Sequence, residues 1–304
     1  MNWFKENQKD FSGDLLFQEP LSRHTYYRIG GPAQILATPK GLNDLKWLAR
    51  GLAETALSHF VLGSGSNILV SDEGFAGLVI KTQKLNSEIS LDGSVLKTGA
   101  SVAVSSLLRQ AAQAGWGGLE LLTGIPGSIG GVVAMNAGTH LGEAKDRLFG
   151  VQAYLLDRGV MKSFLGDELK FSYRKNSFLP TNAIVWSAEW NVTLTDAATV
   201  KSLIDETLTR RKSTQPLDYP SCGSVFKNPR EKNMHAWQVI EKLGLRGHQI
   251  GKAQISEKHP NFIVNLGGAS ARDVCALISL VKSRAEAELG ISLEKEVKFL
   301  GKIT

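Results

Sequence analysis

The chain has 304 residues, of which 42% are hydrophobic and 21% charged, so it can bury a core and is long enough for two or three domains. This composition excludes a disordered chain, and the presence of only two cysteines excludes a disulfide framework and favours a reducing cytoplasm. The polar N-terminus shows no secretory signal, and no apolar run reaches the ~20 residues of a membrane-spanning helix. The net charge of +6 comes from scattered basic residues and suits an enzyme with anionic ligands.

The first half of the chain alternates short predicted strands with turns. The expected strands cover residues 33–38, 60–62, 68–70, 78–81 and 95–98. A helix is predicted over 101–115, because its apolar residues recur at helical spacing on one face. The residues of that face are Val104, Leu107, Leu108, Ala111 and Ala112. Residues 131–135 could return to the sheet as a further strand.

The second half begins with strict alternation over 186–194, which predicts a half-buried strand with its even-numbered residues inward. A helix is predicted over 198–212, where the cations of Arg210–Lys212 complement the helix dipole, and a domain boundary is placed near its start. A long helix opens at Ser270, with Asp273 as an acidic variant of the capping box. The other expected elements are a helix at 236–243 and strands at 262–264 and 297–300.

Two glycine-rich segments indicate ligand binding. Residues 121–143 hold six glycines and no charge before Glu143, and a second glycine turn lies at 61–70. Backbone without Cβ atoms can turn sharply, and successive N–H groups can form a nest for phosphate oxygens. Neither segment has the P-loop or the GxGxxG pattern. Two nests suggest an extended pyrophosphate, as in a dinucleotide, and a pair of tight turns in a glycine-rich fold is the structural alternative.

Three further segments carry candidate chemical groups. In 221–229, a serine beside glycine could pass a proton or could cap its own turn, while Cys222 has no visible histidine partner as a nucleophile. In 171–174, the arginine could bind a carboxylate in bidentate fashion or form a surface ion pair. Residues 293–298 place two glutamates and a lysine on one face, which also fits a solvated edge strand. The histidines show no zinc-ligand spacing, so no metal site is expected.

The order of these motifs resembles one known family. GSGSN, GIPGSIGG with MNAG, SYR, GSVFKNP, KHPNFIVN and LEKEV follow one another from His24 to Gly301 as in the UDP-N-acetylenolpyruvoylglucosamine reductase family. These are cytoplasmic flavin enzymes of peptidoglycan precursor synthesis, and so of cell-wall biogenesis, cell shape and cell division. The short interval between Arg174 and Ser224 is similar to the compact, type II-like form, which lacks an extra substrate-covering loop.

The resemblance implies an α+β protein. A two-lobed FAD-binding region of the vanillyl-alcohol-oxidase (VAO/PCMH) type would cover 1–197, with lobes at about 1–83 and 84–197, followed by an α+β substrate-binding domain over 198–304. FAD would be noncovalent, because Ser66 and Asn67 stand where covalent relatives of this fold can have a histidine. NADPH would reduce the flavin, and the enolpyruvyl ether of UDP-N-acetylglucosamine would become UDP-N-acetylmuramate. No nucleic acid and no membrane insertion are expected.

The resemblance also assigns roles to residues. FAD would be bound by residues of the two glycine segments, namely Leu62, Gly63, Ser64, Gly65, Ser66, Asn67, Thr123, Gly124, Pro126, Gly127, Ser128 and Gly131. Ser224 would protonate C2 of the enolpyruvyl group, and Arg174 with Glu296 would polarise its carboxylate. The substrate would also be bound by Tyr173, Lys227 and Asn228. Lys298 stands where the family often has arginine, so it keeps the charge but loses the bidentate fork.

Two other functions remain open from sequence. One is a different FAD-dependent oxidase or dehydrogenase on the same fold, although the C-terminal motifs argue against an oxidase. The other is a non-catalytic protein that binds nucleotides or nucleic acid through its basic charge, which would give salt-sensitive binding.

Overall fold

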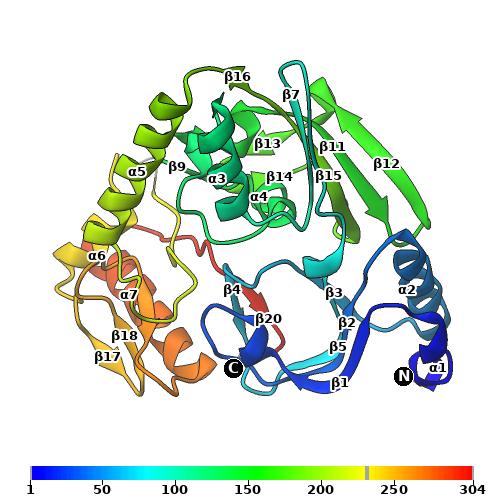
Figure 1. Ribbon diagram of the computed structural model, residues 1–304. Coiled ribbons are helices and arrows are strands. Elements are labelled where there is room, and N and C mark those ends of the chain that lie inside the picture. The colour runs from blue at the N-terminus through cyan, green and yellow to red at the C-terminus, as the bar shows by residue number, and fades with distance from the viewer. Residues whose placement is uncertain (1, 230–232, 303–304) are drawn as a thin grey trace. The chain divides into compact units, whose positions relative to one another are not determined.

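The computed structural model describes residues 2–229 and 233–302 (Figure 1). The chain forms two compact units, each assembled from three segments. Unit 1 comprises Met1–Phe17, Ile35–Ser64 and Gly77–Arg210, and unit 2 comprises Gln18–Gln34, Gly65–Ala76 and Arg211–Thr304. The division into domains at 197/198, with its two N-terminal lobes, stays a prediction.

A five-stranded antiparallel sheet forms the centre of unit 1. Its strands, in spatial order, are β12 (Val160–Leu165), β11 (Leu148–Leu155), β15 (Ala183–Asn191), β7 (Val95–Gly99) and β6 (Ile89–Asp92). Helix α4 (Ile129–Met135) packs on β15 and β7, and α3 (Val104–Ala114) lies beside it (Figure 1). The core between these elements includes Trp190, whose indole nitrogen donates a 2.8 Å hydrogen bond to the Thr98 hydroxyl.

A second, four-stranded sheet contains a parallel pair, β3 with β5. Its order is β1 (Asp14–Pro20), β2 (Pro32–Thr38), β5 (Phe75–Lys81) and β3 (His59–Leu62). Helices α1 (Asn2–Glu6) and α2 (Leu42–Thr55) contact each other through aromatic side chains. The rings of Trp3, Phe4 and Phe11 lie with centroids 4.7–5.4 Å from Trp47. Aromatic burial of this kind anchors the N-terminal segment to helix α2.

Unit 2 contains an antiparallel sheet and the two-stranded parallel pair of β4 (Ile68–Val70) with β20 (Lys298–Leu300). The sheet strands are β17 (Gln249–Ile250), β18 (Ala253–Ile255) and β19 (Ile263–Asn265). Helix α7 (Ala271–Leu289) packs on this sheet and against α6 (Ala236–Lys242). Tyr27 is fully buried in the same core, and its hydroxyl donates to the Ile263 carbonyl at 2.8 Å.

The remaining elements are short, apart from one helix. Helix α5 spans Ala197–Thr214. The two-stranded pairs are β8 (Trp116–Gly117) with β16 (Thr193–Leu194), β9 (Gly138–Thr139) with β10 (Gly142–Glu143), and β13 (Phe171–Ser172) with β14 (Lys175–Asn176). The 3₁₀ helices cover Gln8–Asp10, Leu21–His24, Thr82–Lys84, Glu120–Leu122, Ala144–Asp146 and Gly166–Glu168.

Most predicted elements are confirmed within one or two residues, and the α+β class is confirmed. The confirmed strands are β2, β3, β4, β7, β19 and β20, and the confirmed helices are α5, α6 and α7. Strand β5 begins three residues earlier and helix α3 three residues later than predicted. The capping box is present: the Ser270 hydroxyl accepts from the Asp273 N–H, and the Asp273 carboxylate accepts from the Ser270 N–H, both at 3.0 Å. Arg211 and Lys212 lie in the last turn of α5, as expected.

Two predictions are wrong. Residues 131–135 form the end of α4 rather than a strand, because Ile129, Val132 and Val133 are buried together at helical spacing. The strand predicted over 186–194 breaks after Asn191 and resumes as β16, and its two-sided pattern holds except at two positions. Ser187, expected on the exposed face, is fully buried in β15, the middle strand of its sheet, and Leu194, expected inward, is 59% exposed in the short strand β16.

Among the residues that the structure describes, no helix combines the length and the apolar character needed to cross a membrane.

Candidate functional site

The glycine-rich segment 121–143 forms a loop that leads into α4 and contains two buried hydroxyl groups. Thr123 is fully buried and Ser128 is 6% exposed, and neither hydroxyl has a hydrogen-bond partner within the described residues. A buried polar group without a partner costs about 1–3 kcal/mol, so a bound polar ligand would relieve this cost. Gly127 lies between them at φ +147°, which side-chain-bearing residues rarely adopt. The loop therefore fits a ligand rich in oxygen atoms.

The first half of the other glycine segment lies against this loop within unit 1. A Cβ atom on Gly63 would lie 3.4 Å from the Ser128 hydroxyl oxygen. At Gly131, by contrast, a Cβ atom would meet no described atom within 4 Å, so the absence of a side chain there is not explained by packing. The predicted FAD residues 62–64 and 123–131 are thus brought together, and open space remains beside them.

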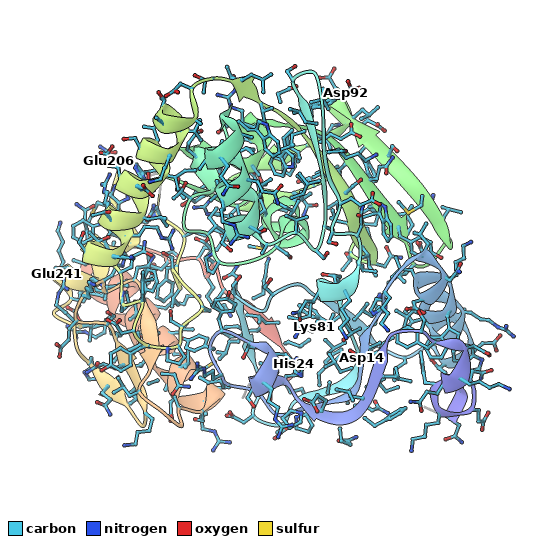
Figure 2. All side chains as sticks on the ribbon, viewed as in Figure 1. Asp14, His24, Lys81, Asp92, Glu206 and Glu241 are labelled. Carbon is cyan, nitrogen blue, oxygen red and sulfur yellow. The ribbon has the colours of Figure 1, made fainter. Side chains whose placement is uncertain are left out.

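Residues 65–70, the rest of this glycine segment, belong to unit 2 and lie beside the C-terminal strand β20. The Asn67 amide nitrogen donates to the Glu296 carbonyl at 3.3 Å, and the Lys298 N–H donates to the Asn67 carbonyl at 3.1 Å. The Gly65 carbonyl accepts from the Tyr26 N–H at 2.9 Å. A Cβ atom on Gly65 would lie 2.2 Å from the His24 carbonyl, so local packing already requires glycine there. Figure 2 labels His24, whose ring nitrogen is 2.9 Å from the Glu19 carboxylate.

Arg174 occupies a strained position in unit 1. It is the second residue of the two-residue turn between β13 and β14 and has φ +55°. Its guanidinium donates to the Gly138 carbonyl at 2.9 Å and lies 3.7 Å from the Glu143 carboxylate. It also lies 5.3 Å from the centre of the Tyr173 ring. A left-handed conformation costs a non-glycine residue about 1–2 kcal/mol, and such strain collects at functional sites.

Asn136 and Glu143 support this arrangement and were not identified from the sequence. The fully buried Asn136 amide donates to the Glu143 carboxylate at 3.1 Å and to the Ser172 carbonyl at 3.0 Å. Its own carbonyl accepts from the Lys145 N–H at 3.1 Å. The sequence feature that could have pointed to them is their position near the end of the glycine-rich segment 121–143, which has no charge before Glu143.

In unit 2, main-chain hydrogen bonds bring the segments of Ser224 and Glu296 together. The Glu296 N–H donates to the Val225 carbonyl at 2.8 Å, so these segments are neighbours. On its other side, Ser224 pairs with Phe262 in an isolated β-bridge. The Asn261 side chain ties this arrangement further, since it accepts from the Phe226 N–H and donates to the Phe226 carbonyl. Ser224, Glu296 and Asn67, which are far apart in sequence, are therefore held in one region.

The predicted substrate residues of unit 2, Lys227 and Asn228, have partners within that unit. Lys227 forms a 2.6 Å ion pair with Glu294, whose side chain is 73% exposed. The side-chain amide oxygen of Asn228 accepts from the Ala236 N–H at 3.0 Å, at the start of α6. An ion pair with so exposed a partner is worth little, so Lys227 can exchange it for an anionic ligand.

The Cys222 thiol is unsuited to nucleophilic chemistry. Burial raises its pKa to about 12, against the smaller effect of a hydrogen bond with Tyr27. The thiolate is the reactive form, so a pKa raised this far keeps the thiol protonated and unreactive near neutral pH. Over residues 2–229 and 233–302, no group of three or more His, Cys, Asp or Glu side chains could hold a metal ion.

Comparison with known proteins first defines the class. Residues 33–164 match the FAD binding domain family, and residues 215–300 match the family model described as UDP-N-acetylenolpyruvoylglucosamine reductase, C-terminal domain. The unpartnered hydroxyls of Thr123 and Ser128 and the open space at Gly131 fit FAD, because all three lie in the matched region. The fold and this loop thus define a flavin-dependent oxidoreductase.

The family follows from relatives that span the whole chain. UDP-N-acetylenolpyruvoylglucosamine reductase of Heliobacterium modesticaldum is 42% identical over 293 residues, 96% of this chain and 93% of that protein. The enzyme of the same name from Carboxydothermus hydrogenoformans is 41% identical over 98% of this chain and 97% of its own. A crystal structure of the reductase from Thermus caldophilus has a TM-score of 0.80 at 36% identity, covering 95% of this chain and 99% of that one. The chain belongs to the UDP-N-acetylenolpyruvoylglucosamine reductase family, which confirms the predicted family, flavin-binding fold and FAD cofactor.

Proposed function

We propose that the chain reduces the enolpyruvyl ether of UDP-N-acetylglucosamine to UDP-N-acetylmuramate, with NADPH as the hydride donor. Bound FAD supplies the hydride transfer, from NADPH to C3 of the enolpyruvyl group. The observation that carries this proposal is the meeting of three motifs in unit 2, where Asn67 bonds to Glu296 and Glu296 bonds to the residue after Ser224. A glycine loop of the flavin region and two candidate catalytic residues thus share one region.

Hydride arrival at C3 leaves negative charge on C2 and on the neighbouring carboxylate. Fixed groups that stabilise this charge lower the barrier, and they act best when they are positioned before the reaction. Arg174 is the proposed cation for the carboxylate, since its guanidinium already has fixed partners. Glu296, in its protonated form, is the proposed hydrogen-bond donor to the same carboxylate.

Ser224 is the proposed proton donor to C2. Its backbone is held by Phe262 on one side and by the Val225–Glu296 hydrogen bond on the other, which fixes the main chain that carries the hydroxyl. The O–H bond breaks as the C2–H bond forms, and the resulting alkoxide regains a proton from water. A serine hydroxyl is a weak acid, so this role requires a strongly basic enolate carbon and a hydroxyl that is aimed at it.

The remaining roles follow the family pattern. Residues 62–67 and 123–131 hold FAD, with the Thr123 and Ser128 hydroxyls as hydrogen-bond donors to its oxygen atoms. Tyr173, Lys227 and Asn228 bind the substrate. Binding of FAD is noncovalent, supported by Ser66 in the first loop. The two cysteines are both unpaired thiols, which supports a cytoplasmic location.

The test follows NADPH consumption and product together. The holoenzyme should oxidise one NADPH for each enolpyruvyl substrate and give a product that is two hydrogens heavier. Rapid NADPH oxidation with O₂ in the absence of this substrate would instead support an oxidase. Salt-sensitive DNA binding by a colourless protein would support the nucleic-acid alternative.

A further inference from the structure

The two groups that contact the Arg174 guanidinium belong to a single hairpin of unit 1. In the antiparallel pair of β9 and β10, Gly138 lies directly opposite Glu143. The Gly138 carbonyl and the Glu143 carboxylate both face Arg174, at 2.9 Å and 3.7 Å. Residue 138 must be glycine for this pairing, because a Cβ atom would lie 2.1 Å from the Gly142 carbonyl. The hairpin is therefore built so that an accepting carbonyl and a negative charge meet the arginine.

The Glu143 carboxylate is itself fixed by a buried amide. Asn136, in the left-handed position that ends α4, donates to one Glu143 oxygen at 3.1 Å and leaves the other oxygen toward Arg174. The same amide donates to the Ser172 carbonyl, two residues before the arginine. One side chain thus ties the hairpin that carries Arg174 to the hairpin that carries Glu143.

Burial makes this ion pair different from the surface pairs of the chain. The side chains of Arg174 and Glu143 are 16% and 13% exposed. Charges that are removed from water are screened little by salt, so the attraction between Glu143 and Arg174 is stronger than it would be at the surface. The strained φ of +55° at Arg174 needs such surroundings, because a two-residue turn without restraint could relax to a lower-energy form.

We propose that Glu143 is a positioning residue that orients the Arg174 guanidinium for the substrate carboxylate, with Asn136 fixing Glu143 in turn. This inference rests on the proposed role of Arg174. Glu143 does not touch the reacting atoms; it acts by holding the cation in place before the charge develops. Misplacement of a catalytic group by about 1 Å can cost up to 10²-fold in rate, so a partial loss of orientation is expected to cost about 10-fold.

The experiment is a double-mutant cycle on the holoenzyme. Glu143→Gln keeps the size and a carbonyl oxygen for Asn136 but removes the charge. It should keep its flavin and its rate of flavin reduction by NADPH, while reoxidation by the enolpyruvyl substrate falls about 10-fold. In an Arg174→Ala background, Glu143→Gln should cause no further loss, because its effect passes through the arginine.

Glu189→Gln is the matched control, since it removes a similar charge from a 3.7 Å ion pair with Lys97 in the same unit and should leave both half-reactions unchanged. Wild-type reoxidation in Glu143→Gln, additive losses in the double variant, or loss of flavin from Glu143→Gln would each overturn the positioning role. If Arg174→Ala itself reoxidised normally, the proposed role of Arg174 would fail as well, which separates the two results.

Discussion

The two units hold their candidate catalytic groups in different ways. In unit 1, Arg174 lies in a left-handed turn, and its guanidinium contacts a main-chain carbonyl, of Gly138, and a side chain, of Glu143, in a neighbouring hairpin. In unit 2, Ser224 and Glu296 lie on segments joined by main-chain hydrogen bonds. Main-chain bonds do not depend on side-chain identity, so substitutions at Ser224 and Glu296 should change chemistry alone. Substitutions of the residues around Arg174 should instead displace its guanidinium.

The largest effect should come from Ser224→Ala, which removes one oxygen and leaves the flanking main-chain bonds in place. The enolate would then wait for a proton from water, and general acid catalysis is worth about 10²–10⁴-fold. Single-turnover reoxidation by substrate should fall by that factor, with NADPH reduction nearly intact. Ser224→Cys should recover part of the rate, because a thiol can also donate. Wild-type reoxidation in Ser224→Ala would remove this serine from the mechanism.

Glu296→Gln should be the next largest. It keeps the 2.8 Å bond from residue 296 to Val225 and removes only the acid, so substrate-dependent reoxidation should fall about 10²-fold, the scale for losing a transition-state stabiliser. Flavin reduction by NADPH should change far less. Equal loss in both half-reactions would mean that Glu296 supports the cofactor. The claim that substitutions at Glu296 change chemistry alone would then be wrong.

Gly131→Val tests the flavin loop of unit 1 without disturbing its packing. The added side chain starts in open space and lies in a helix, where glycine is unfavourable by about 1 kcal/mol relative to alanine. The protein should fold yet purify with little flavin, as measured by its visible absorbance per chain. Gly41→Ala, also in open space and in unit 1, is the control and should stay yellow. Full flavin content in Gly131→Val would place FAD elsewhere.

A smaller effect concerns the framework of unit 2. Burial raises the pKa of Asp273, but hydrogen bonds from Ser270 and Lys252 outweigh it, and the net pKa lies below its ordinary value of 3.8. Its stabilisation is therefore present above that value and is lost as the pH falls through the folded-state pKa. Asp273→Ala should lower the free energy of unfolding by about 1 kcal/mol at pH 7. Urea denaturation should show this difference shrinking below about pH 4; a constant difference would contradict the capping account.

The smallest effect should be at Cys222. Its thiol is buried with a pKa of about 12, so iodoacetamide at pH 8 should leave the activity of the holoenzyme unchanged. Cys222→Ala should keep both half-reactions close to wild type. An inactive Cys222→Ala enzyme that still binds flavin would show that the Cys222 thiol, rather than the Ser224 hydroxyl, is the reactive group of unit 2.

Local signals predicted the local structure well. The Ser270–Asp273 capping box could be identified because both partners lie within one helical turn. The strand predicted over 131–135 was wrong because short apolar runs beside glycine fit strand and helix alike, and burial in the fold decides between them. The exposure predicted for Ser187 was wrong for a similar reason, since its burial depends on the strands beside β15.

The family motifs predicted the candidate site residues but not what surrounds them. Asn67 and Glu296 are 229 residues apart, and no local pattern announces their hydrogen bond. Glu143 was visible only as the first charge after the glycine segment, and its contact with Arg174 depends on the pairing of β9 with β10. Contacts between distant segments follow from the sheet topology, which periodicity does not contain.

The most direct test of the central claim is anaerobic stopped-flow spectroscopy of the holoenzyme. NADPH should bleach the flavin absorbance, and the enolpyruvyl ether of UDP-N-acetylglucosamine should then restore it in a single turnover without O₂. The restored absorbance should match the amount of UDP-N-acetylmuramate formed. A reduced flavin that stays bleached with this substrate, and recovers only when O₂ is admitted, would contradict the account.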